Sequence, residues 1–515
     1  MRLRALAVPA LAGPVAVALA LAAPAAPALA HGDLVDEVVL KNVVVPATSG
    51  TFANMDHVAN LQYRVTGGTR GQGGTDVEFA RIGGRDYAFA GTYQNGLQIV
   101  DITDPTVPRP VAVYDCQVLQ GDVQVFPQGG RVLAAYTADA AFGAKGAASR
   151  CGMDLDIPAT ALGTVLLDVT DPAAPTSVGF AAVPEGSHNT TVHPSGDYLY
   201  NSNSDLLART SDPDSSAQPK ISVIDIRNPA APVEVQDFPL PYVPLSLGSE
   251  SHDITFSADG TRAYSAALSQ TLVLDTADPA APRLVAQVLD PAVQVSHGAD
   301  PLTLTRADGT KRTFLVVSDE QAGAATGTNC PGGGLHFYDI TGEREKAPQK
   351  VAAWFIAESK PSTATCTAHV FRMHSEQEMI TVAWYDQGVR VLDLDAFADQ
   401  PGSPTTVLRG SQGGIEEIGG IVFDDANTWS FKTNKIAADG SFYGVGNDLG
   451  RGLDVYRFRG LGRTVPPLEP RELLPAPGKK RTPKPASSGQ LLSGAPAAGL
   501  GLLVLLGSVV RRRRG

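Results

Sequence analysis

Four of the nine histidines in this sequence recur at one position of an internal repeat. Aligning the repeats on the turn that follows each first apolar run places His188, His252 and His369 at equivalent positions, where three other repeats carry Thr75, Asp122 and Lys432. In the remaining repeat an insertion precedes the turn, and the Ser-His match assigns His297 to the same position. Neutral imidazoles that converge from neighbouring units are typical ligands of iron, copper or zinc. The sequence therefore offers a candidate site for one transition-metal ion.

Carboxylates accompany these histidines. Asp122 is a candidate carboxylate ligand, and Glu185 and Glu250 precede His188 and His252 closely enough to be candidate acceptors that orient the imidazoles. The alternative is structural: each histidine bonds the backbone or an Asp within its own unit. The sequence identifies no catalytic residue, and it lacks the G-x-S-x-G, H-E-x-x-H, P-loop and EF-hand motifs of other site classes.

The elements that must position these residues are short strands. An apolar run that closes on Asp recurs six times, at Asp101, Asp168, Asp225, Asp275, Asp339 and Asp393. Each copy belongs to a unit of about 50 to 70 residues with four β-type runs and D-G or D-P turns, as in one propeller blade. We expect these Asp residues to cap turns at strand ends. The fold predicted is all-β, a seven-bladed β-propeller, with six or eight blades as alternatives.

The last repeat contains only three β-type runs, whereas an additional run at residues 58–65 precedes the first repeat. We expect this N-terminal run to supply the outer strand of the seventh blade and so close the propeller as a velcro strand. In a propeller, the first strand of each blade lines the central channel. The four histidines should then lie together at one mouth of that channel.

The segments NGLQIVDITDP, TVLLDVTDP and ISVIDIRNP resemble the LVIVD repeat of bacterial surface and secreted β-propeller proteins. The resemblance covers residues 57–460. It implies the propeller fold and a location outside the cell, and it implies no particular reaction.

Four cysteines in an exported chain predict two disulfides. Of three possible pairings, the nearest-neighbour one joins Cys116 to Cys151 and Cys330 to Cys366. All four positions fall in segments that emerge at the histidine mouth of a propeller. The disulfides are therefore expected to stiffen that face.

Both ends of the chain read as targeting segments. Residues 1–30 resemble a signal peptide that ends in a small-x-small site, and residues 31–56 form an N-terminal segment. After the propeller we predict a Pro-rich linker (461–490), a transmembrane anchor (491–510) and a cytoplasmic arginine tail (511–515). The protein is thus expected at the cell surface, held in the plasma membrane by its C-terminal helix.

The charge composition narrows the classes of partner that this protein could bind. The formal net charge is −12, although both ends are basic, so the propeller itself is more acidic still and nucleic acid is disfavoured as a partner. Our first hypothesis is a non-enzymatic binding protein whose loop face takes a protein, glycan or envelope ligand. The alternative is a secreted metal-dependent enzyme, an oxidoreductase, with a four-histidine mononuclear site on the propeller axis.

Overall fold

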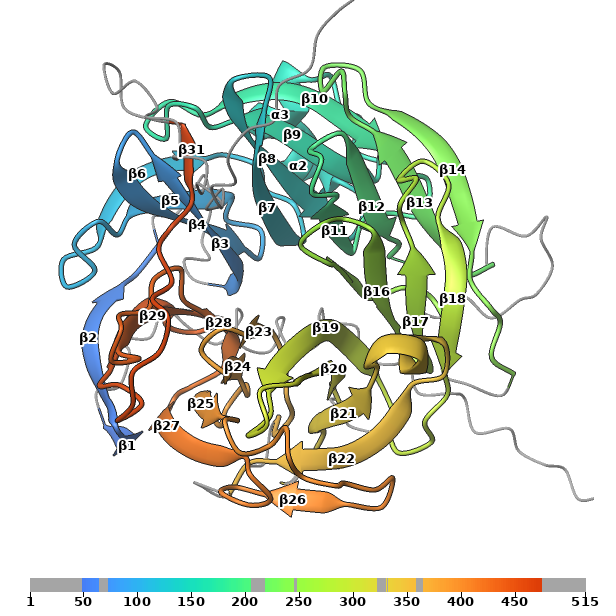
Figure 1. Cartoon of the computed structure of the whole chain (residues 1–515). Coiled ribbons are helices and arrows are strands. Elements are labelled where there is room, and N and C mark those ends of the chain that lie inside the picture. The colour runs from blue at the N-terminus through green and yellow to red at the C-terminus, as the bar shows by residue number, and fades with distance from the viewer. Residues whose placement is uncertain are drawn as a thin grey trace, which may run out of the picture. The chain divides into compact units, whose positions relative to one another are not determined.

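The computed structural model describes residues 49–63, 73–204, 218–244, 248–321, 330, 332–357 and 365–474. Within these residues the strands form seven sheets around a common axis (Figure 1). The prediction of an all-β, seven-bladed propeller is thereby confirmed.

Each blade is built from four antiparallel strands. The innermost strands are β3 (Gly74–Ile82), β7 (Gln120–Gln128), β11 (Asn189–Val192), β15 (Asp253–Phe256), β19 (Ser296–Thr305), β23 (Phe371–His374) and β28 (Thr428–Lys432). The second strands are β4 (Arg85–Thr92), β8 (Arg131–Ala138), β12 (Tyr198–Ser202), β16 (Arg262–Ala267), β20 (Lys311–Asp319), β24 (Met379–Ala383) and β29 (Phe442–Asp448).

The third strands are β5 (Leu97–Asp101), β9 (Gly163–Asp168), β13 (Lys220–Asp225), β17 (Gln270–Asp275), β21 (Leu335–Asp339), β25 (Val389–Asp393) and β30 (Gly452–Phe458). The fourth strands are β6 (Arg109–Tyr114), β10 (Thr176–Ala182), β14 (Val233–Pro239), β18 (Arg283–Val288), β22 (Gln349–Phe355), β27 (Glu416–Phe423) and β2 (Met55–Leu61). Three blades gain a fifth strand: β31 (Glu472–Leu474) beside β3, β26 (Val407–Arg409) beside β22, and β1 (Gly50–Ala53) beside β27. The short helices are α2 (Gly143–Ala148), α3 (Arg150–Asp154) and the 3-10 helix η1 (Gly342–Lys346).

The recurring Asp at the end of the third strand has one local role. In all six copies a carboxylate oxygen accepts a hydrogen bond from the backbone N–H two residues later, at 2.9–3.2 Å. This side-chain turn ends the strand and starts the connection to the fourth strand. The apolar residues before the Asp are buried between neighbouring sheets, so one short motif supplies both the turn and the core.

The fourth strand of blade 7 comes from the N-terminal part of the chain. β2 pairs antiparallel with β30, from Met55 opposite Phe458 to Leu61 opposite Leu453. The predicted run was 58–65, so the strand begins earlier, and residues after 63 in that run lie outside the described part. Whether this pairing holds the propeller closed remains a prediction.

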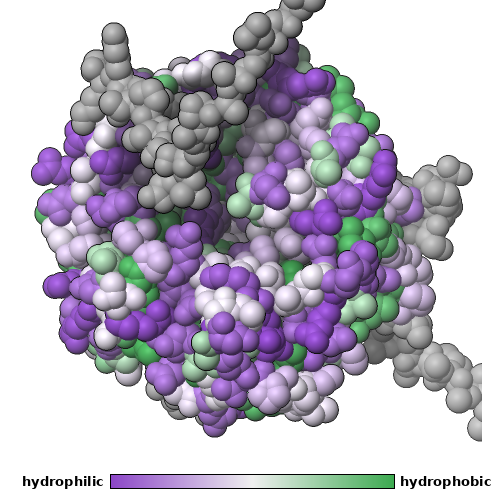
Figure 2. All heavy atoms as spheres, viewed as in Figure 1, coloured by the Kyte–Doolittle hydropathy of each residue, from purple (hydrophilic) through white to green (hydrophobic). Residues whose placement is uncertain are grey.

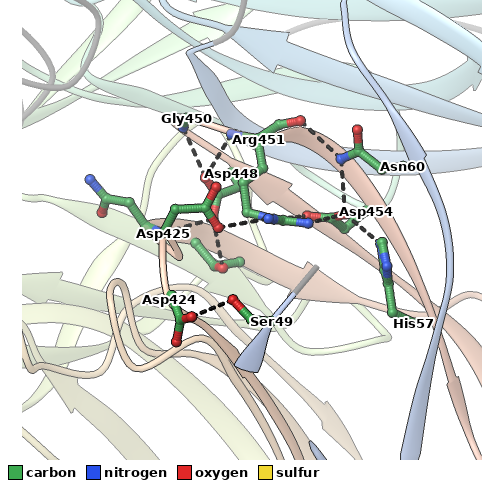
Figure 3. Close-up of polar contacts among 11 residues, drawn as sticks. Ser49, His57, Asn60, Asp424, Asp425, Asp448, Gly450, Arg451 and Asp454 are labelled. Carbon is green, nitrogen blue, oxygen red and sulfur yellow. Dashed lines mark hydrogen bonds and ion pairs between the residues drawn. The ribbon is translucent and has the colours of Figure 1, made fainter. Parts of the chain in front are cut away.

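A polar cluster lies on this pairing, and we call it the seam cluster: the buried Asp448, Arg451 and Asp454 and the half-buried His57, Asn60 and Asp425 (Figure 3). Arg451, only 1% exposed, binds Asp454 and Asp425 at 2.7 Å each, and its guanidinium lies 3.7 Å from the centre of the Phe423 ring. Asp454 also contacts His57 at 2.7 Å and accepts a hydrogen bond from Asn60 at 2.9 Å. Strand β2 is thus joined to β30 by side chains as well as by backbone.

The two predicted disulfides, Cys116–Cys151 and Cys330–Cys366, are both present. Cys151 lies in α3, which belongs to the insertion between β8 and β9, and Cys116 follows β6. Each disulfide therefore ties an insertion to the segment that enters the next blade.

The predicted targeting segments 1–30 and 491–510 lie outside the described residues. No helix within the described residues is long and apolar enough to cross a membrane. The start of the predicted linker 461–490 packs on the propeller: Ile436 and Leu468 exchange backbone hydrogen bonds, and β31 pairs with β3.

Candidate metal centre

The four repeat histidines lie side by side at one end of the channel. His188, His252 and His369 each precede the first strand of a blade, and their backbone N–H groups donate to carbonyls of the second strand at 2.7–3.0 Å. His297 lies in β19. This shared pairing explains why one repeat position brings the side chains together. All four are buried, with at most 3% of each residue exposed.

The imidazoles form a continuous row. Successive ring centres are 4.3 Å apart from His188 to His252, 4.2 Å from His252 to His297, and 4.2 Å from His297 to His369. The Nε2 atoms of His188 and His252 are 3.0 Å apart. Like groups from four adjacent blades therefore face one another.

Groups outside the row hold the two end imidazoles by Nδ1. Asp139 contacts Nδ1 of His188 at 2.9 Å, and the carbonyl oxygen of Trp429 lies 2.6 Å from Nδ1 of His369. An imidazole held in this way presents Nε2 on its other side, which is the usual arrangement of a metal-binding histidine.

A carboxylate that the sequence analysis missed completes the cluster. Glu320 follows β20, and its oxygens lie 3.8 Å from Nε2 of His297 and 3.6 Å from Nε2 of His369. Possible ligand atoms of His252, His297 and Glu320 all fall within 4.8 Å of one another. The hydroxyl of Tyr385 donates to Glu320 at 2.5 Å, and the Tyr385 ring lies 4.5 Å from that of His369.

A signal for Glu320 was present in the sequence. Asp139 and Glu320 are each the first residue after the second strand of a blade. From this position each carboxylate reaches a histidine of the following blade. An acidic residue at the end of the second strand is therefore a usable indicator of this site.

Burial determines the charge of the cluster. It lowers the pKa of His252 well below the usual value, with further lowering by His188 and His369, and it lowers the pKa of His369 to about 3. Burial also raises the pKa of Glu320 to about 8. At neutral pH these two histidines are uncharged, so their lone pairs are available to a cation.

The other predicted carboxylates lie elsewhere. Glu185 pairs with the Lys220 ammonium at 3.0 Å, and Glu250 accepts hydrogen bonds from the backbone N–H groups of Lys220 and Ser251. Asp122 accepts a hydrogen bond from the backbone N–H of Thr190 at 3.1 Å. Burial raises its pKa well above the usual value, and repulsion by Asp76 and Asp253 adds to the effect. The carboxylate among the imidazoles is Glu320, and the roles predicted for Glu185, Glu250 and Asp122 stay predictions.

A cavity of about 450 Å³ adjoins the histidines and is lined by residues of the seven innermost strands, including His252 and His297. A second cavity of about 640 Å³ shares Gln124, Val192, Pro194, Arg372 and Met373 with it. Residues 468–473, beside β31, border the second cavity. Figure 2 shows a hollow lined by hydrophilic residues near the middle of the face that is viewed in Figure 1. The histidines therefore lie beside a cavity that is lined by both polar and apolar side chains.

Comparison with known proteins supports the family resemblance. Residues 84–116 match the family model described as the LVIVD repeat, which confirms the resemblance noted in the sequence. A search of curated proteins gave no match.

Solved structures of similar fold have low sequence identity to this chain. The periplasmic gluconolactonase PpgL of Pseudomonas aeruginosa is 14% identical, with a TM-score of 0.49, over 76% of this chain and 96% of that one. A functionally unknown protein from Desulfotomaculum acetoxidans is 14% identical (TM-score 0.39; 69% and 90% covered), and a protein from Lactobacillus plantarum is 12% identical (TM-score 0.45; 74% and 98% covered). The assignment of the fold rests on the seven sheets themselves.

Proposed function

We propose that this protein is a metal-dependent enzyme whose centre is a transition-metal ion bound on the propeller axis by His188, His252, His297 and His369. The observation that carries the proposal is the unbroken row of four buried imidazoles from four adjacent blades. These side chains contact one another across blades.

The distances suit a metal. Neighbouring ligand nitrogens at about 2.0–2.1 Å from one ion lie about 2.8–3.4 Å from each other when the coordination is octahedral or tetrahedral. The Nε2 atoms of His188 and His252 are already 3.0 Å apart. Glu320 supports the same centre, because a neighbouring cation would favour its ionised form and so offset the cost of burying it.

The chemistry follows from the ligand set. Imidazoles and one carboxylate suit iron or copper, which support redox reactions, and zinc, which supports hydrolysis. The chain itself contributes Tyr385, whose phenolic hydroxyl donates a hydrogen bond to Glu320. The adjoining cavity gives a small substrate room to approach the ion. We favour an oxidoreductase.

The test is spectroscopic. The purified full chain, reconstituted with Cu²⁺, should show electron paramagnetic resonance with coupling to several imidazole nitrogens, and this coupling should be lost in His252→Ala/His297→Ala. His336→Ala is the matched control, because His336 is equally buried but lies in β21, outside the row. A spectrum of randomly bound copper, unchanged by the double variant, would contradict the metal centre and favour the rival hypothesis of a binding protein.

We further propose that the propeller is exported and anchored at the cell surface by residues 491–510. The sequence signals at both ends support this location. Protease added to intact cells should release a soluble propeller cut between residues 475 and 490, because residues up to 474 pack on the propeller. Full-length protein that survives this treatment inside the cells would contradict the location.

A further inference from the structure

The cavity beside the histidines is lined by more acidic than basic side chains. Lys432 pairs with Asp76 and Glu78 at 2.8 Å, and Arg372 pairs with Glu78. Three further carboxylates line the same cavity: Asp122, Asp253 and Asp300. Throughout the described residues, none of these three forms an ion pair.

The contacts of the three carboxylates are neutral. Asp122 and Asp253 accept hydrogen bonds from the backbone N–H groups of Thr190 and Ile254, and Asp300 accepts one from the Thr255 hydroxyl. Each contact uses one oxygen of a group that accepts several hydrogen bonds. The carboxylates retain the capacity to bind a donor that enters the cavity.

A second, independent feature points to a ligand in the same place. Gln120 lines the cavity and is only 3% exposed, yet its side-chain oxygen has no hydrogen-bond partner among the described residues. Its backbone φ is +67°, which is unfavourable for a residue with a side chain. Its amide nitrogen lies 3.4 Å from Nε2 of His188, so this acceptor lies at the histidine end of the cavity.

Size favours an organic ligand over a bare ion. The cavity of about 450 Å³ lies in the range of small-molecule sites, about 300–1,000 Å³. Within the described residues, the three carboxylates are not part of the group of possible metal ligands that lie within 4.8 Å of one another, which consists of His252, His297 and Glu320. The second cavity supplies a path from the face that carries β31.

We propose that this cavity binds a small organic amine, whose ammonium group is held by Asp122, Asp253 and Asp300 and whose remaining part extends toward Gln120 and the histidines. The proposal names organic amines as the substrate class of the proposed enzyme. That the bound amine reacts rests on the proposed function, whereas its binding does not. Binding itself requires no metal.

The experiment uses three probes of equal chain length: 1,4-diaminobutane, 1,4-butanediol and succinate. Calorimetric titration of the metal-free full chain should show binding of the diamine alone. Asp253→Asn/Asp300→Asn preserves shape but removes charge, and it should weaken binding at least about tenfold, since charge-assisted pairs are the stronger ones. Asp122→Asn alone is a second, milder variant that should weaken binding in the same direction.

Asp308→Asn is the control, because Asp308 lies in an exposed turn and should leave binding unchanged. Equal binding of the diol or of succinate, or diamine binding that is unaffected in both cavity variants, would overturn the proposal. So would displacement of the diamine by Mg²⁺ or Ca²⁺ in wild type and in His252→Ala/His297→Ala alike, because the carboxylates would then hold a metal ion. If the histidines bind no metal but the diamine still binds, the proposed enzyme fails and the amine site stands.

Discussion

Two polar clusters of this propeller, the seam cluster and the row of histidines, differ in how their charges are balanced. In the seam cluster, opposite charges meet: Arg451 lies 2.7 Å from both Asp454 and Asp425. In the row, like groups meet, with the Nε2 atoms of His188 and His252 3.0 Å apart. Both clusters join segments that are distant in the sequence.

The difference indicates a difference in role. Arg451 carries its own counter-charges, so the seam cluster holds β2 against β30 without any ligand. Burial lowers the pKa values of His252 and His369, and the nearby His188 lowers both further, a cost that a bound cation would offset. A cluster whose opposite charges balance one another suits a structural role, whereas a row of uncharged imidazoles with available lone pairs suits a metal ion.

Of the changes at the seam cluster, removal of β2 should have the largest effect on the stability of the propeller. A chain that begins at Gly67 lacks β1 and β2, which leaves β30 as an unpaired edge, and we expect loss of cooperative unfolding or aggregation. A chain that begins at Asn54 lacks only β1, whose residues are all exposed, and should unfold cooperatively. Equal melting temperatures of the two proteins would show that β2 does not close the propeller.

A point substitution in the seam cluster should have the next largest effect. Arg451→Met leaves Asp454 buried without its main counter-charge, which costs about 3–5 kcal/mol of unfolding free energy. Arg459→Met is the matched control on the same strand pair, because Arg459 is exposed and bonds Asp56 at the surface. Denaturant titration should separate the two variants clearly, and similar midpoints would refute a structural role for the seam cluster.

The pH dependence of stability should have opposite signs in the two clusters. His369 has a folded pKa of about 3 against 6.5 for the free side chain, so the folded state binds fewer protons and loses stability as the pH falls below 6.5. Asp448 in the seam has its pKa raised to about 6 by burial and by Asp454, so its contribution is present near pH 4 and is lost as the pH rises to 6.

The test of this difference is His369→Gln in metal-free protein. Between pH 7 and pH 5 the variant should lose about 1–2 kcal/mol less unfolding free energy than wild type. Identical losses in the two proteins would show that His369 does not carry the lowered pKa.

The parts of the fold that follow local rules could be predicted from the sequence. The Asp at the end of each third strand bonds the backbone two residues later, so the motif reports the turn directly. The histidines could be aligned for a similar reason, because each lies within two residues of the start of its blade's first strand. The disulfides followed from the proximity of the cysteines in the sequence.

The parts that depend on contacts between strands could not be predicted in this way. Glu185 and Glu250 are near histidines in the sequence, but both are bound by Lys220 of β13, by its ammonium group for Glu185 and by its backbone N–H for Glu250 of the next blade. Asp139 and Glu320 are distant in the sequence from His188 and His369, and the packing of one blade against the next brings them together. Sequence proximity is a poor guide where side chains cross from blade to blade.

The central claim, that the row of histidines is a metal centre, is tested most directly by the metal content of the purified full chain. We predict about one transition-metal ion per chain, retained in His336→Ala and lost in His252→Ala/His297→Ala while the fold survives. Metal that stays far below one ion per chain after reconstitution with iron, copper and zinc in turn, or that is retained by the double variant, would contradict the claim.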